Sequence, residues 1–336
     1  MTDLHRRCDL ASWILAGLAL LAVLKLSLLP ALLAGLLVYE LVHVLAGRLG
    51  FLRVGAQRGK LVSVALLATL VVLVLIVAGY ATWAFVRSDA GSASALLAKL
   101  AEIVEGARGT LPEWAGDMVP DNVDDLKAAI VEWLREHAKE LQHAGAAAGL
   151  GAAHLLVGMV IGAMVSLADA RPEAQSGPLS HALHERAVRL GEAFRRIVFA
   201  QVKISALNTV LTAIFLWAVL PMFGIKLPLL KTMVVVTFLA GLLPVIGNLV
   251  SNTLIVLVGL SQGPGAAMAC LGFLVAVHKL EYFVNARIVG SQIQARAWEL
   301  LVAMLAMEAA FGIAGVVAAP VYYAYLKSEL KARGLI

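Results

Sequence analysis

The amino-acid sequence predicts an all-α fold, that of a polytopic integral membrane protein with about eight spans. Of the 336 residues, 61% are hydrophobic and only 15% are charged, whereas a soluble domain has roughly half apolar and about a quarter charged residues. The mean hydropathy is +0.89. Apolar runs continue for about 20 residues, the length of a membrane-spanning helix, while a transmembrane β-barrel needs shorter segments of alternating polarity. A soluble enzyme and a β-barrel are therefore excluded.

Residues 1–86 contain the first three predicted membrane helices. Two apolar runs, over residues 10–29 and 31–49, meet at Pro30, which predicts a tight helical hairpin. A third run covers residues 61–86. Basic residues flank the hairpin on both sides, so the positive-inside rule places the N-terminus and the following loop in the cytoplasm. These basic residues are Arg6, Arg7, Arg48, Arg53, Arg58 and Lys60.

Residues 87–143 form a polar segment between the third and fourth spans. This segment holds eleven acidic and six basic residues, and so contains half of the chain's 22 acidic residues. Its negative charge fits the side opposite the cytoplasm. Apolar residues recur every three or four positions from Val123 to Leu141, with Asp121 or Asn122 as the N-cap, which predicts an amphipathic helix. We therefore expect an extracytoplasmic acidic helical segment.

Residues 144–168 are predicted to form the fourth span, and residues 169–203 return to the cytoplasm. The span contains glycine pairs at a spacing of four, which allows membrane helices to approach closely. These pairs are Gly145/Gly149 and Gly158/Gly162. The cytoplasmic segment carries six basic residues around two prolines, so we expect a linker followed by an amphipathic helix that leads into the next span.

The C-terminal transmembrane core covers residues 204–336. After a fifth span over residues 204–221, the apolar stretch over residues 229–260 is too long for one straight crossing and contains Pro244 and Gly247. Proline inside a helix removes a backbone donor and clashes with the preceding turn, so we expect a helix broken within the membrane. Backbone groups freed by such a break cannot face lipid and must line protein or a wet cavity.

Two further apolar runs complete the predicted core. One leads to His278, and the last covers residues 300–325. If residues 229–260 form one broken span, the chain crosses the membrane eight times and both termini are cytoplasmic. A re-entrant hairpin over residues 285–315 is the alternative.

Polar groups within the apolar runs mark the candidate pathway, because a charge at the bilayer centre costs about 2.5–3.5 kcal/mol on insertion scales. Glu308 is the strongest candidate, since Gly312 and Gly315 beside it would let another backbone approach; the alternative is a glutamate kept for packing. Asn248 and Asn252 lie one turn apart after the predicted break. Such amides hold polar substrates or ions in transporters, or they form interhelical hydrogen bonds.

A third candidate group lies at the end of the seventh run. His278 and Glu281 share a helical face, and Asn285 follows one turn later. Charges of opposite sign at Lys279 and Glu281 can neutralise each other, so this cluster is either structural or part of the pathway.

We expect no cofactor, no metal site and no nucleic-acid surface. Cys8 and Cys270 form neither a disulfide framework nor a metal-thiolate motif, and the usual zinc, serine-nucleophile, Walker-loop and CxxC motifs are missing. The net charge of +5 comes from Lys and Arg beside apolar runs, which is a topology signal of membrane proteins. The sequence therefore does not indicate an enzyme.

The order of these parts resembles the autoinducer-2 exporter family (AI-2E family transporters), which are permease-like bacterial membrane proteins. The likeness covers essentially the whole chain and is most specific from Leu243 to Tyr325, through the segments LPVIGN, RIVG and FGIAG. The matching residues, in order, are Pro244, Gly247, Glu281, Asn285, Ile288, Gly290, Phe311, Gly312, Gly315 and Pro320.

This resemblance implies an inner-membrane secondary transporter or exporter of a small solute, embedded in the bilayer as a homo-oligomer. Ala286 and Arg287 stand where many members have a proline, and Glu308 with two alanines stands where they tend to have glycine. A carboxylate there favours a cation or a proton over a neutral ligand. The alternatives are therefore a sodium (or lithium)/proton antiporter and, in a different class, a membrane scaffold or regulator whose acidic segment binds a partner.

Overall fold

The structure, a computed structural model, describes residues 3–50, 56–87, 128, 131–133, 135–168, 177–242, 246–260, 262–293 and 296–336. Every regular element in these residues is helical, which confirms the predicted all-α membrane fold. Six of the described helices are long and apolar enough to cross a membrane, and three shorter helices are also apolar. The chain divides into two compact units, which are described separately below. Most of the predicted acidic segment over residues 87–143 lies outside the described residues.

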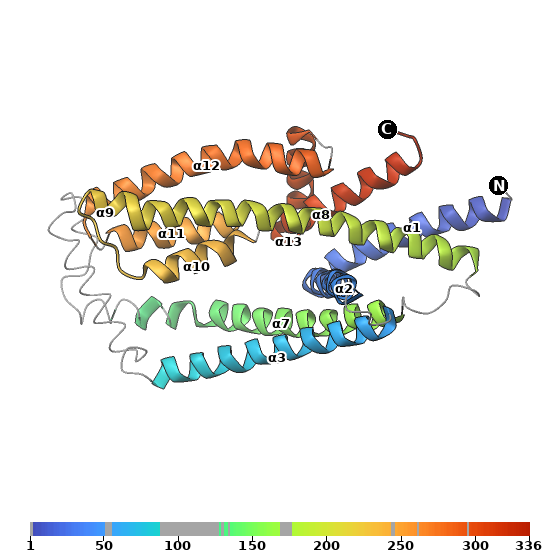
Figure 1. The fold of residues 1–336 in the computed structure, drawn as a ribbon, viewed down its shortest axis with the longest axis horizontal. Helices are drawn as coiled ribbons and strands as arrows, with labels where there is room; N and C mark the ends of the chain where they lie inside the picture. The colour runs from blue at the N-terminus through green and yellow to red at the C-terminus, as the bar shows by residue number, and fades with distance from the viewer. Residues whose placement is uncertain are drawn as a thin grey trace. The chain divides into compact units, whose positions relative to one another are not determined.

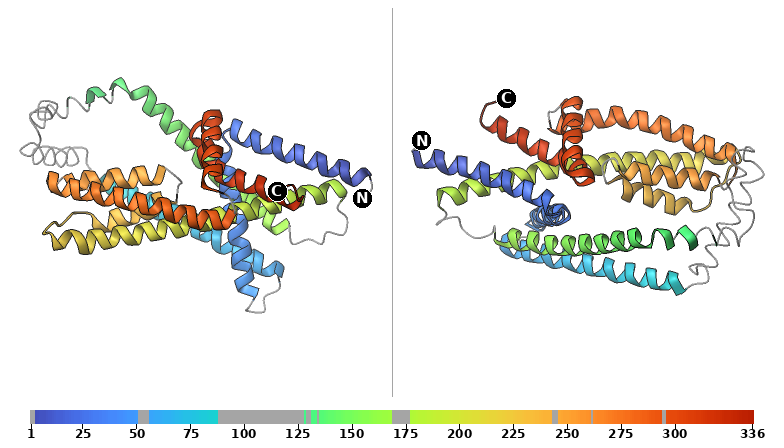
Figure 2. Two further views of the ribbon diagram at one scale, coloured as in Figure 1. Left: turned by 90° about the horizontal axis from the view of Figure 1, so that it is seen from above. Right: turned by 180° about the vertical axis from the view of Figure 1, so that it is seen from behind.

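The first unit comprises residues 1–73, 145–200 and 289–336. In it, α1 (Asp3–Lys25) and α2 (Leu29–Gly50) are joined by a short turn, but α2 runs across α1 and does not fold back along it, so the tight hairpin predicted at Pro30 is not formed (Figures 1 and 2). Ser27 in this turn adopts a left-handed conformation with φ of 56°. Pro30 lies in the first turn of α2, where a missing backbone N–H leaves no hydrogen bond unmade.

Close backbone contact joins α2 to α7 (Ala138–Ala168). A methyl group on Gly158 would overlap the carbonyl oxygen of Ala31, and one on Gly162 would overlap the carbonyl oxygen of Gly35. Only glycine at these two positions allows such an approach, so the packing role predicted for this pair is confirmed. The other predicted pair differs, because open space surrounds Gly145 and Gly149 within the described part of the chain.

Four long helices carry segments of both units: α3 (Ala56–Arg87), α7, α8 (Pro178–Ile214) and α12 (Pro264–Ile293). Of these, α3 follows α2, and its apolar side chains are mostly exposed. Helix α8 continues through a π-helical turn (Phe215–Val219) into α9 (Leu220–Met222). The predicted amphipathic helix and the predicted fifth span are thus one continuous helix, since no helix breaker separates them.

The second unit comprises residues 74–144 and 201–288 and contains a helical hairpin. α10 (Leu230–Gly241) and α11 (Ile246–Leu260) have 12 and 15 residues and pack along each other (Figures 1 and 2). A methyl group on Gly247 would overlap the carbonyl oxygen of Ala240, so the chain reverses between the two helices. At 1.5 Å per residue, each arm is about 18–22 Å long, which is shorter than the ~30 Å hydrocarbon core. The expected break is present, but the helices on either side of it form a hairpin and are not two halves of one span.

A second hairpin lies within α13 (Ala297–Ala332), which follows α12 (Pro264–Ile293). Gly312 interrupts the helix with φ of 60° and ψ of −144°. A methyl group on Gly315 would overlap the carbonyl oxygen of Met307, eight residues earlier, which a straight helix does not allow. α13 is therefore two antiparallel arms, over residues 297–311 and 313–332. The alternative prediction of a hairpin over residues 285–315 therefore differs from the structure in its bounds. The hairpin begins only at Ala297, because α12 stays helical to Ile293.

Each unit has its own core. In the first unit, the end of α1 and the start of α2 contribute Leu24 and Leu29, which pack with Ala318, and Met307 and Phe311 of the α13 hairpin lie against them. In the second unit, the core lies between the α8–α9 end, the α10–α11 hairpin and α12. Its buried members include Leu216, Met233, Ile255 and Cys270.

Candidate functional site

The α13 hairpin carries the strongest of the predicted pathway residues. Glu308 lies one turn before the break at Gly312, and its side chain is exposed. Within the described part of the chain, the Glu308 carboxylate has no ion pair or hydrogen bond. The surrounding span has a mean hydropathy of 2.2, so an unpaired charge there is costly in a membrane unless water or a ligand solvates it.

Polar contacts hold the two arms of this hairpin together at the end away from Gly312. The Tyr323 hydroxyl donates a hydrogen bond to Glu299 Oε2 over 2.5 Å, and Lys327 Nζ lies 2.6 Å from the same oxygen. Glu299 and Lys327 are largely buried, with side-chain exposures of 19% and 13%. This cluster fixes the register of the arms and thereby places Glu308, Gly312 and Gly315 together at the tip.

The α10–α11 hairpin positions a second group of predicted residues. Gly247 and Asn248 lie in the first turn of α11, directly after the reversal, and Asn252 is half-buried one turn later. Pro244 lies outside the described residues. The tip thus has the arrangement expected from the sequence, in which amide-bearing residues follow a helix break.

Side chains of α8 hold the carbonyl groups that α10 leaves unpaired at its end. Gln201 Nε2 donates to the Gly241 carbonyl over 2.7 Å, and Ser205 Oγ donates to the Phe238 carbonyl over 2.6 Å. The last carbonyls of any helix lack intrahelical partners, and in a membrane they need partners from the protein. Gln201 and Ser205 therefore anchor the hairpin to α8.

These two residues belong to a polar stripe on α8 that was not predicted from the sequence. Gln201, Ser205, Asn208 and Thr212 follow one another at spacings of four, three and four, and so share one helix face. Ser205 and Thr212 are each 1% exposed, and Asn208 is 8% exposed. The periodicity was available in the sequence, although it was hidden inside an otherwise apolar run.

The third predicted group lies along α12. His278 is exposed near the middle of this helix, and Glu281 and Asn285 follow on its helical backbone. The Glu281 and Asn285 side chains lie outside the described structure. Within the described residues, no group of three or more His, Cys, Asp or Glu side chains is placed to hold a metal ion.

Comparison with protein families settles the assignment. The AI-2E family transporter model matches residues 10–333. The chain belongs to this family. No curated protein and no solved structure matches it. An AI-2E transporter is a membrane transport protein, so the resemblance expected from the segments between Leu243 and Tyr325 is confirmed, and the chain is a multi-pass membrane permease.

A buried ionic cluster in this AI-2E transporter was not predicted from the sequence. Arg186 on α8 is 4% exposed and pairs with both Asp9 of α1 and Glu329 of α13. Arg189 lies 2.6 Å from Glu329, and Arg333 pairs with Asp9. The sequence separates Arg186 from Asp9 by 177 residues, so no local pattern indicated the pairing.

Proposed function

We propose that this AI-2E transporter is a secondary transporter that exports a small solute across the bacterial inner membrane, with both termini in the cytoplasm. Glu308 carries the proposal, because it is an exposed carboxylate in an apolar helix beside a break in the backbone. Irregular backbone at membrane depth is tolerated only where it lines protein or water, so the tip of the α13 hairpin is best explained as part of a solvated path.

The α10–α11 hairpin supports the same function from the second unit. It has the broken backbone found in transporter binding sites, and the half-buried Asn252 supplies a neutral hydrogen-bonding group. Family membership supports transport over the scaffold alternative.

A sodium (or lithium)/proton antiporter is the second candidate, and Glu308 is the observation that favours it. A carboxylate can bind a proton and a cation in alternation, which a purely neutral lining cannot do. Such a mechanism requires Glu308 to change its protonation state during each cycle, so Glu308→Gln should abolish exchange.

Everted membrane vesicles with a pH-sensitive dye test both candidates. Sodium, lithium or potassium is added to energised vesicles that contain the wild type, Glu308→Gln or Glu136→Gln. Glu136 is an exposed glutamate outside the apolar spans, so it is the matched control. Cation-dependent collapse of the proton gradient in the wild type and Glu136→Gln, but not in Glu308→Gln, would establish antiport.

If none of the three proteins collapses the proton gradient when a cation is added, cation exchange is excluded. Export of a small organic solute then remains as the proposed function. Release of autoinducer-2 from cells that express each protein is then the first assay. Loss of release in Glu308→Gln at normal protein levels would support the proposed path. Wild-type activity of Glu308→Gln in every assay would remove Glu308 from the mechanism.

A further inference from the structure

Lys25, in the last turn of α1, is a second charged side chain in the apolar part of the first unit. It is exposed, and Leu24 and Leu26 flank it in the sequence. Among the residues that the structure describes, the Lys25 ammonium makes no ion pair and no hydrogen bond. A charge within a membrane span is costly unless another group solvates it, so Lys25, like Glu308, marks a functional site.

Contacts between α1 and the second arm of α13 fix the level at which Lys25 lies. The Tyr322 hydroxyl donates a hydrogen bond to the Leu20 carbonyl over 3.2 Å. One turn later on α1, Leu24 packs against Ala318. The two helices are therefore antiparallel where they meet, and α1 ends beside α13 (Figures 1 and 2). Lys25 thus lies level with the turn of α13 that precedes Ala318.

Glu308 lies at nearly the same level on the first arm of α13. Its backbone nitrogen is 3.2 Å from the position that a methyl group on Gly315 would take. Gly315 and Ala318 are three residues apart, which corresponds to about 4.5 Å along a helix. Met307, next to Glu308, also packs against the core that contains Leu24. The end of α1 and the tip of the α13 hairpin therefore bring two opposite charges to one place.

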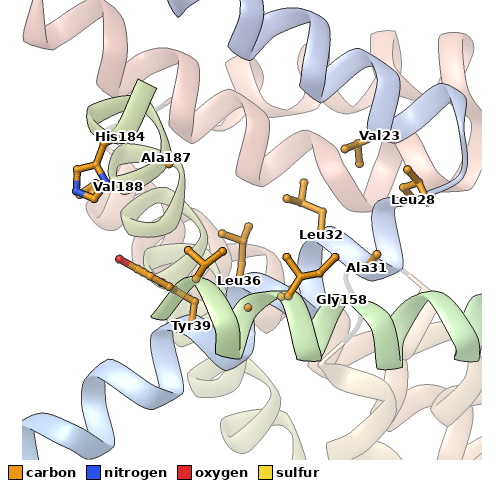
Figure 3. Close-up of a pocket in the computed structure, with 14 residues that line it drawn as sticks. Val23, Leu28, Ala31, Leu32, Leu36, Tyr39, Gly158, His184, Ala187 and Val188 are labelled. Atoms are coloured by element: carbon orange, nitrogen blue, oxygen red, sulfur yellow. The ribbon is translucent and has the colours of Figure 1, made fainter. Parts of the chain in front are cut away.

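The surroundings of the Lys25 ammonium are apolar on one side. Val23 and Leu28, on either side of the α1–α2 turn, line an apolar pocket together with Leu32 (Figure 3). The first arm of α13, over residues 297–311, is about 22 Å long at 1.5 Å per residue, which is shorter than the ~30 Å hydrocarbon core. The tip, and Lys25 beside it, therefore do not reach the far surface of the membrane.

We propose that Lys25 and Glu308 bind the two charged ends of a small zwitterionic solute of the amino-acid class. The Lys25 ammonium donates to the carboxylate of the solute, and the Glu308 carboxylate accepts from its ammonium group. This inference rests on the proposed function, because it names the class of solute that passes Glu308.

Charge balance favours a zwitterion over other solutes. A simple cation would neutralise Glu308 and leave Lys25 without a counter-charge, and a neutral solute would leave both charges unpaired. A zwitterion pairs both charges at once through charge-assisted hydrogen bonds. Open space surrounds Gly312 at the tip, within the part of the chain that the structure describes, so a small molecule has room there.

The test measures binding to the purified full chain in detergent, so the result does not depend on transport. Each common amino acid is added at millimolar concentration, and thermal unfolding is followed, because a ligand that binds only the folded state raises the melting temperature. At least one amino acid should do so. Its N-acetyl derivative, which lacks the ammonium group, and its methyl ester, which lacks the carboxylate, should bind at least tenfold more weakly.

Two outcomes of this assay would overturn the proposal. Either no amino acid raises the melting temperature, or both derivatives bind as tightly as the parent amino acid. The proposed transport of another solute would survive either outcome, since the vesicle and release assays test it separately.

Single variants assign the two ends of the site. Lys25→Met should bind the methyl ester more tightly than the amino acid, whereas Glu308→Gln should bind the N-acetyl derivative more tightly. Lys139→Met and Glu136→Gln, at exposed positions near the start of α7, should keep the preference of the wild type. An unchanged preference in Lys25→Met would contradict the role of Lys25.

A direct ion pair between Lys25 and Glu308, with no ligand, is the competing explanation. It predicts that each single variant lowers the melting temperature and that the double variant Lys25→Met/Glu308→Gln restores it. It also predicts that no amino acid stabilises the wild type. This combination of results would show that the two charges serve only each other.

Discussion

At the scale of single residues, a close glycine contact and a buried ionic cluster join helices of the first unit. Gly162 has no room for a side chain against α2, whereas Gly149 on the same helix faces open space. Gly162→Ala should therefore destabilise the protein by about 1–3 kcal/mol through overpacking. Gly149→Ala should be neutral or slightly stabilising, because alanine is the better helix former. Thermal unfolding in detergent, followed by size exclusion, measures the stability of both variants. Equal melting temperatures for the two variants would contradict the close contact of Gly162 with α2.

The ionic cluster gives a second residue-scale prediction. Arg186→Met leaves Glu329, which is 0% exposed, with one cation fewer in a buried site. Breaking a buried pair typically costs about 3–5 kcal/mol, so this variant should unfold at a clearly lower temperature than the wild type.

Arg196→Met is the control for this prediction. Arg196 is 48% exposed and lies 3.4 Å from Glu192, and such surface pairs contribute at most about 1 kcal/mol. A wild-type melting temperature for Arg186→Met would show that the cluster contributes little to stability.

At the scale of elements, the two hairpins are the features that place the candidate site. The α13 hairpin depends on Gly312, whose φ of 60° and ψ of −144° belong to a region that side chains rarely adopt. Gly312→Ala should therefore strain or straighten the turn, at a cost of about 1–3 kcal/mol, and separate Glu308 from Gly315. We expect transport to fall strongly in vesicles at equal protein levels.

Gly272→Ala is the matched control for the hairpin prediction. Gly272 lies within α12, is exposed and has open space around it. Transport by this variant should equal that of the wild type. If Gly312→Ala also transports normally, the tip of the α13 hairpin has no role in the path.

The sequence predicted the break between α10 and α11 but neither the reversal there nor the break at Gly312. Pro244 and Gly247 are local signals, because proline and glycine act on their own backbone. The reversal at each break depends on contacts between distant residues, such as Glu299 with Lys327, 28 positions apart. The stripe from Gln201 to Thr212 was missed for a different reason, since its four polar residues are diluted by apolar neighbours.

At the scale of the whole molecule, the hairpins change the expected membrane topology. A hairpin returns the chain to the side from which it entered, so Leu229 and Gln262 lie on one side. Arg296 then lies on the same side as the C-terminal residues, whichever depth the α13 hairpin reaches. With α12 as one crossing, Gln262 and Arg296 are on opposite sides. In the eight-crossing topology, residues 229–260 and residues 300–325 each cross once, and Arg296 then lies opposite the C-terminus.

Cysteine labelling separates these two topologies. In a background with Cys8→Ser and Cys270→Ala, single cysteines at Gln262, Arg296 and Leu335 are all exposed positions. A membrane-impermeant maleimide applied to intact cells and to everted vesicles should label Arg296→Cys and Leu335→Cys in everted vesicles only, and Gln262→Cys in intact cells only. The positive-inside rule favours this result, because Arg287 and Arg296 then both lie near the cytoplasm. Labelling of Arg296→Cys in intact cells would restore the eight-crossing topology and show that at least one of the two hairpins crosses as a span.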